Sequence, residues 1–174
     1  MSLKIPVPPW LLILITLLVV TLVINPSERD FSWYRTLKRP AWISMQPWIP
    51  AAWFLISVSF YFSALSFWLK SGDWHWIGAY GALLVLLRVN HLVICRLRNL
   101  FAGLPFWLLS WMATVLLALI VRPTSPLAAG LLVPVLLWTP VEALVTVQMI
   151  GLNRKEQRSG HGPNDRRPAQ SRRL

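Results

Sequence analysis

Charged residues are scarce in this chain of 174 residues. Only 13% of the sequence is Asp, Glu, Lys or Arg, whereas 56% is hydrophobic. Soluble domains carry about 25% charged residues, and so few charges could not cover a surface that faces water. The composition therefore excludes a water-soluble globular domain and predicts one integral membrane domain embedded in a lipid bilayer.

Cysteine and acidic residues are also rare. The single cysteine, Cys95, excludes an internal disulfide framework and a cysteine-based metal cage. The formal net charge of +11 does not indicate a nucleic-acid partner, because the basic residues lie in short loops and a tail, where they set membrane topology. The chain shows no Ser-His-Asp set, metal-ligand cluster or glycine-rich phosphate loop. We therefore predict no catalytic residues and no metal site.

Five apolar segments are present, and each is near the roughly 20 residues that cross a bilayer as a helix. The first run ends in Asn25-Pro26 without a small-residue cleavage site, so we interpret it as a retained helix and not as a signal peptide. Pro134 and Pro140 fall inside the last segment and are expected to bend it. The predicted fold is an all-α integral membrane protein, a five-transmembrane-helix bundle within residues 1–152, with helices at about 7–25, 47–69, 75–95, 104–121 and 127–150.

The distribution of basic residues predicts the orientation of this multi-pass protein. One side of the bundle carries only Lys4, Lys70 and Arg122, whereas the other carries six basic residues in loops and seven in the tail. The positive-inside rule therefore places the C-terminus in the cytoplasm. The tail, residues 153–174, has no apolar periodicity and is expected to be disordered and to lie against anionic lipid heads.

Tryptophan is abundant, with 11 residues in the chain. Four of them lie in the stretch WYRTLKRPAWISMQPWIPAAW, residues 33–53. An interfacial belt is the usual explanation of tryptophan in a membrane protein. We favour it for the residues near predicted helix ends, namely Trp10, Trp74, Trp76, Trp107 and Trp111.

Two motifs resemble the TspO/MBR family, also called the translocator protein or tryptophan-rich sensory protein family. The family pattern WYxxLxKPxW is matched by residues 33–42, with Arg39 in place of the lysine. The pattern SPLAAxLLxPYLxW is matched by residues 125–138, with Val135 in place of the tyrosine. The resemblance covers about residues 28–150 and implies the same five-helix fold. The chain departs from the family in the third helix, where Arg88 is one of the replacements.

The resemblance implies that the protein binds tetrapyrroles, such as porphyrin or haem, without a covalent bond. In this family the ligand lies between the helices, under the loop that joins the first two. The implied role is a membrane sensor or regulator; the alternatives are a light-dependent porphyrin-degrading enzyme and a transporter of a small apolar ligand. A homodimer remains an open alternative. Basic residues of the loop can pair with propionates, and the expected ligand-binding residues are Trp33, Tyr34, Trp42, Trp53, Trp138 and Glu142.

Glu142 is included because it follows Trp138 by four residues and so lies on the same helix face. A carboxyl group at membrane depth costs about 3 kcal/mol or more, so it should be paired, protonated or wetted by a cavity. Arg88 and His91 near the end of the third segment are the candidate partners. Three interpretations stay open: a structural Arg88–Glu142 ion pair, a polar floor for the ligand, and His91 as an axial ligand to a haem iron.

Overall fold

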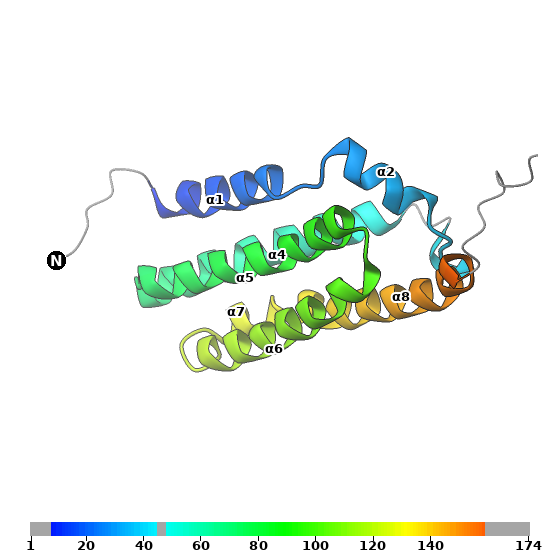
Figure 1. Cartoon of the computed structure of the whole chain (residues 1–174). Coiled ribbons are helices and arrows are strands. Elements are labelled where there is room, and N and C mark those ends of the chain that lie inside the picture. The colour runs from blue at the N-terminus through cyan, green and yellow to red at the C-terminus, as the bar shows by residue number, and fades with distance from the viewer. Residues whose placement is uncertain (1–7, 45–47, 159–174) are drawn as a thin grey trace, which may run out of the picture.

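The computed structural model describes residues 8–44 and 48–158, and these form an antiparallel bundle of long helices with short helical segments between them (Figure 1). In chain order the described helices are α1 (Pro9–Val23), α2 (Glu28–Thr36), α3 (Ala41–Ser44), α4 (Trp48–Ser71), α5 (Trp74–Leu97), the 3-10 helix η1 (Leu100–Gly103), α6 (Leu104–Val121), α7 (Pro126–Gly130) and α8 (Val133–Arg158).

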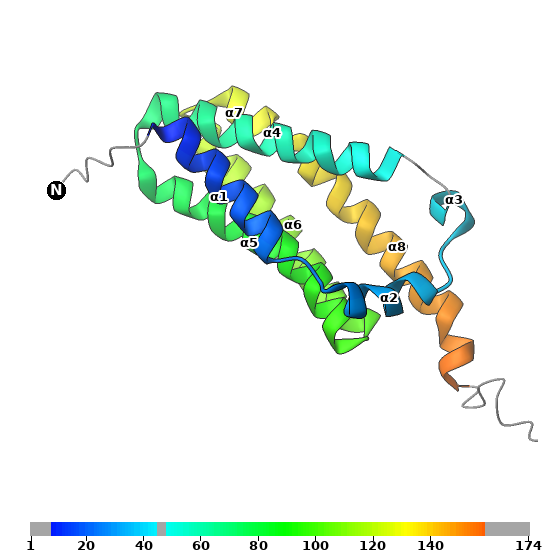
Figure 2. The ribbon, with the colours of Figure 1, turned by 90° about the horizontal axis from the view of Figure 1, so that it is seen from above.

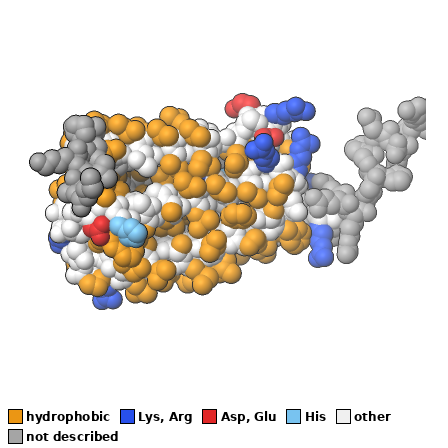
Figure 3. All heavy atoms as spheres, turned by 60° about the vertical axis from the view of Figure 1, so that its left-hand side comes forward, with side chains coloured by type: hydrophobic (Ala, Val, Ile, Leu, Met, Phe, Trp, Pro, Cys, Tyr) orange, Lys and Arg blue, Asp and Glu red, His pale blue; other side chains and the backbone are white. Residues whose placement is uncertain are grey.

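Four helical stretches are long and apolar enough to cross a bilayer: α4, α5, η1 with α6, and α7 with α8. The number rises to five if α1 and α2, which are bent by 68° relative to one another, are counted as one broken span. Figure 3 shows hydrophobic side chains along the length of the bundle and basic side chains gathered at its ends. This is the distribution that a lipid environment requires, and the predicted all-α membrane bundle is confirmed.

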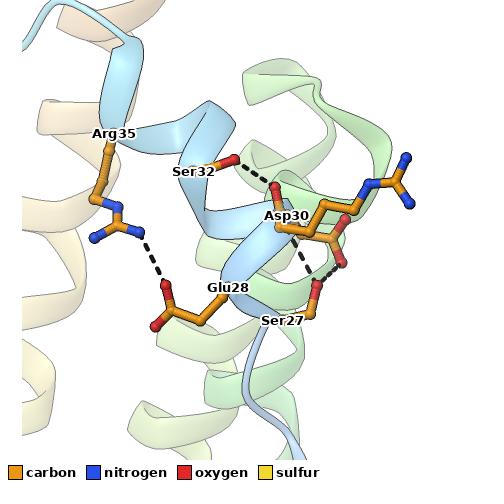
Figure 4. Close-up of polar contacts among 6 residues, drawn as sticks. Ser27, Glu28, Asp30, Ser32 and Arg35 are labelled. Carbon is orange, nitrogen blue, oxygen red and sulfur yellow. Dashed lines mark hydrogen bonds and ion pairs between the residues drawn. The ribbon is translucent and has the colours of Figure 1, made fainter.

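The bend between α1 and α2 follows from two adjacent residues. Pro26 cannot continue a helix, because it lacks a backbone N–H and its ring restricts the residue before it. Ser27 then starts α2: its Oγ accepts a hydrogen bond of 3.2 Å from the Asp30 backbone N–H and donates one of 2.8 Å to the Asp30 carboxylate. Arg35 pairs with Glu28 at 3.0 Å along the same helix (Figure 4). A well-capped, charged α2 therefore turns away from the apolar α1.

The last segment is broken and not merely bent. The helix stops after Gly130 and resumes at Val133, so Pro134 lies in the first turn of α8 and only Pro140 lies inside it. A proline is tolerated in the first turn, where its missing N–H would have no helical partner. The break places α7 against α4, where Ser63 Oγ donates to the Ala128 carbonyl at 2.7 Å.

The turn between α5 and α6 depends on the small size of Gly103. A Cβ atom at this position would lie 2.6 Å from Cγ1 of Ile94 and 2.9 Å from Oδ1 of Asn90. Both neighbours are buried in α5, so neither can move aside without disturbing the core. η1 can therefore pack against α5 only because residue 103 has no side chain.

We predict that Gly103→Ala lowers the stability of the bundle by about 1–3 kcal/mol, the usual cost of forcing extra volume into a packed core. The thermal unfolding midpoint in detergent measures this. Gly81→Ala is the matched control, because a Cβ there meets nothing within 4 Å and alanine is the better helix former. Equal midpoints for the two variants would contradict the prediction.

The connection from α2 to α3 is fastened to the end of α8. Asn153 is buried, and its side chain accepts a hydrogen bond from the Lys38 N–H and donates one to the Lys38 carbonyl, each at 3.0 Å. Nearby, Trp42 Nε1 donates to Gln148 Oε1 at 2.8 Å. We call residues 28–44 the lid, and Figure 2 shows α2 and α3 lying between the ends of α1 and α4, close to α8.

The observed end of α8 corrects the sequence analysis. The helix continues to Arg158, past the expected end at residue 150, and Asn153 belongs to the folded domain and not to the tail. Apolar periodicity ends near residue 150, but the lid supplies backbone partners that keep the next turns in place. The remainder of the predicted tail, residues 159–174, lies outside the described residues.

We predict that Asn153→Ala loosens the lid. The variant leaves the Lys38 N–H and C=O without their side-chain partner, at a cost of about 1–3 kcal/mol. Hydrogen exchange should become faster in the lid while protection in α4 and α5 stays unchanged. Leu152→Ala, at the neighbouring exposed position, is the control. Uniformly faster exchange throughout the bundle would show that Asn153 supports the whole fold instead.

Candidate functional site

A cavity of about 220 Å³ lies between the lid and the helices of the bundle. Its walls come from the lid and from α4, α5, α6 and α8, so segments far apart in the sequence meet around one space. Most of the lining is apolar or aromatic. The lining residues are Phe31, Tyr34, Arg39, Ile43, Ile49, Trp53, His91, Ile94, Trp107, Trp138, Glu142, Val145, Thr146 and Met149. We call this space the main cavity.

Four aromatic rings form a continuous row along the wall of the main cavity. The ring centroids of Trp138 and Trp53 are 6.5 Å apart, those of Trp53 and His91 are 5.8 Å apart, and those of His91 and Trp107 are 5.3 Å apart. Each pair meets edge to face, at interplanar angles between 72° and 89°. Edge-to-face packing is a favoured arrangement that fixes the rings. The cavity therefore has a wall with preformed geometry.

The last ring of the row is held by a hydrogen bond. Trp107 Nε1 donates to Thr146 Oγ1 at 3.2 Å, and that hydroxyl donates to the Glu142 carbonyl at 2.8 Å. The indole N–H is thus satisfied by a protein group at the cavity wall. The Trp107 ring is fixed between α5 and α8 as a structural part of the wall.

The charged groups of the site come from three different elements. Arg39 of the lid lies over the ring of Tyr34, with its guanidinium carbon 5.2 Å from the ring centroid. Glu142 projects from α8, where its carboxyl group interacts with Trp138, Arg88 and Trp53. Its Oε2 has no hydrogen-bond partner among the described residues. The cavity thus contains a carboxyl group that protein donors satisfy only in part.

The expected ion pair between Arg88 and Glu142 is not formed. Among residues 8–44 and 48–158, the ion pair that the structure shows is Arg35–Glu28 in the lid. Arg88 instead places its guanidinium carbon 5.0 Å from the centroid of the Trp53 ring, in a cation–π contact. The guanidinium thus has the Trp53 ring, and not the Glu142 carboxylate, as its direct contact, and the structural ion-pair interpretation of Glu142 is wrong.

A second cavity of about 180 Å³ lies beside the main cavity, at the bend between α1 and α2. It shares three wall residues with the main cavity, and adds the bend and one side chain from α5. Its lining residues are Ile24, Asn25, Pro26, Phe31, Trp53, Arg88 and His91. We call it the bend cavity. Small-molecule sites span about 300–1,000 Å³, and the main cavity alone is below this range.

The structure brings four of the six predicted ligand-binding residues to the main cavity: Tyr34, Trp53, Trp138 and Glu142. The other two have supporting positions. Trp33 packs against the hydrophobic cluster beneath the lid. Trp42 is 43% exposed and binds Gln148, so it fastens the lid and does not line the cavity.

Sequence reasoning assigned Trp107 to the interfacial belt, and that assignment is wrong. Trp107 is buried and lines the main cavity, whereas Trp10 and Trp111 are exposed on the outer surface. Phe31 was also missed as a wall residue. The sequence contains no signal that separates Trp107 from Trp111, because both lie in an apolar segment one helical turn apart.

His91 lines both cavities, with its ring held between Trp53 and Trp107. Among the described residues, no group of three or more His, Cys, Asp and Glu side chains comes together to hold a metal ion. The chemistry that this arrangement supports is recognition: stacking on indole and imidazole rings, with one carboxyl group and two guanidinium groups for polar contacts.

The comparison with known proteins agrees with this architecture. No curated protein matches the chain. The family model described as the TspO/MBR family matches residues 10–152, a range that includes every residue that lines the two cavities. Because the match covers most of its length, the chain belongs to the TspO/MBR family.

Proposed function

We propose that this protein is a membrane sensor or regulator that binds a tetrapyrrole, such as porphyrin or haem, in the main cavity. The observation that carries the proposal is the row of four aromatic rings in a cavity of a TspO/MBR family member. A planar macrocycle is attracted to such rings, and each aromatic contact contributes about 0.5–1.5 kcal/mol beyond burial of area.

The lid supports a sensing role. Tyr34 and Arg39 reach the main cavity from the lid, while Glu142 and Met149 reach it from α8. The Tyr34 hydroxyl donates to the Met149 sulfur at 3.7 Å, a weak contact between the two sides. A ligand that touches both sides adds contacts between the lid and α8. Occupancy would therefore shift the lid towards its closed arrangement, because a ligand favours the state to which it binds better.

We expect Trp53 and Trp138 to dominate ligand affinity. Trp138→Ala in the full chain should weaken protoporphyrin binding by about 1–3 kcal/mol, which corresponds to a five- to 150-fold rise in Kd, because it removes one stacking surface. Absorption of the porphyrin and quenching of tryptophan fluorescence in the dark both measure this affinity.

Trp10→Ala is the matched control for the titration. It also removes one indole, but Trp10 lies 49% exposed at the start of α1, outside both cavities. Unchanged affinity in both Trp53→Ala and Trp138→Ala proteins would place the ligand elsewhere.

Illumination of the same samples tests the enzymatic alternative. Light-dependent bleaching of the porphyrin that needs the cavity tryptophans supports degradation, and a stable chromophore supports sensing.

Glu142 should control ligand choice more than stability. Its carboxyl forms no ion pair with the described residues and has an unpartnered oxygen. Glu142→Ala loses the interactions with Trp138, Arg88 and Trp53, but it also ends the desolvation of a buried polar atom, which costs about 1–3 kcal/mol. We expect an unchanged or higher unfolding midpoint, a larger cavity and an altered order of affinities among porphyrins with different side groups.

Glu142→Gln is the control, because it keeps the volume and removes the charge. If the two variants change the ligand profile alike, charge decides the choice; if only the alanine variant does, cavity size decides it. A large fall in the unfolding midpoint with an intact ligand profile would contradict the assignment of Glu142 to ligand recognition.

A further inference from the structure

We propose that the bend cavity is a subsite for a carboxylate group, bound by Arg88, on a ligand whose planar part occupies the main cavity. This inference rests on the proposed function and adds the subsite and the residue that would take an acidic substituent of the ligand. Three observations support the inference: Arg88 lines the bend cavity, its Nε has no hydrogen-bond partner among the described residues, and the two cavities share wall residues.

Arg88 borders the bend cavity from α5, and its guanidinium is only partly satisfied by protein groups. Its Nε is buried and has no hydrogen-bond partner, and no described acidic side chain forms an ion pair with it. Glu142 influences it electrostatically, but lines only the main cavity. A guanidinium at membrane depth is costly unless it is paired or reaches water, so the arrangement favours an anion at this place.

The guanidinium is held in position for such an anion. The contact with the Trp53 ring at 5.0 Å fixes one face of the planar group. A guanidinium carries five N–H donors in a fork that matches both oxygens of a carboxylate. Of these donors, the buried Nε–H has no hydrogen-bond partner among the described residues. Asn25, from the bend, adds a second polar residue to the same cavity.

The two cavities are adjacent, because Phe31, Trp53 and His91 belong to the walls of both. The proposal requires that a flat ligand packed on this shared wall in the main cavity extends a short substituent past it to Arg88. Arg39 provides a second guanidinium on the lid side of the main cavity. A ligand with two acidic arms matches this pair of cations, one at the lid and one at the bend.

The test compares an acid with its ester. The full chain, in nanodiscs of phosphatidylcholine, is titrated in the dark with protoporphyrin IX, which carries carboxylates, and with its dimethyl ester, which carries none. Wild type should prefer the acid. Arg88→Gln should weaken binding of the acid by about tenfold or more, the effect of losing a hydrogen bond to a charged group, and should leave the affinity for the ester unchanged.

Two further variants keep the test sharp if Arg88→Gln folds poorly. Arg88→Lys retains the charge but not the fork, so it should keep part of the preference for the acid. Arg122→Gln removes an exposed arginine after α6, outside both cavities, and should behave as wild type. Equal weakening of acid and ester by Arg88→Gln would make Arg88 a structural residue and overturn the inference.

The remaining outcomes separate this inference from the function on which it rests. If wild type binds acid and ester equally, the cavity binds porphyrin but the carboxylate subsite is wrong. If wild type binds neither, the proposed function fails and the subsite with it. The same titration in nanodiscs that contain phosphatidylglycerol tests whether a lipid phosphate competes for Arg88. If the protein loses its preference for the acid in these nanodiscs, the Arg88 subsite binds a lipid headgroup, and the ligand assignment is overturned.

Discussion

The hydrocarbon of a bilayer offers no hydrogen bonds, so each polar group of this chain must find a partner within the protein. The constraint explains where the helices are interrupted. At the α1–α2 bend, Ser27 caps the next helix; at the α7 start, Ser125 Oγ accepts from the Ala128 N–H at 3.3 Å. The lid backbone is satisfied by Asn153. At these three places a specific side chain binds the irregular backbone.

The same constraint makes the exceptions informative. Oε2 of Glu142 and Nε of Arg88 lack hydrogen-bond partners among the described residues, and both groups border cavities. A buried polar group without a partner costs about 1–3 kcal/mol, and such departures from internal satisfaction are characteristic of functional sites. These two groups are the polar contacts on which the proposed binding of a flat ligand with polar substituents rests.

The site could be anticipated only in part, and the reason lies in the nature of membrane helices. Soluble helices reveal their inner face through apolar periodicity, but a helix in lipid is apolar all round because lipid tails are as apolar as the core. Trp107 and Trp111 are thus indistinguishable by pattern, although one is buried in the cavity wall and the other faces outward. Trp53 and Trp138 were found through the family motifs and not through periodicity.

The sequence by itself determined the membrane class, the approximate spans, the places of the prolines that interrupt helices and the family, since these depend on local composition and on motifs contiguous in the chain. The tertiary structure alone decided that Arg88 contacts Trp53 and not Glu142, that Asn153 holds the lid, and that two cavities share one wall. These features depend on how helices rotate and cross, which is set by packing among residues distant in sequence.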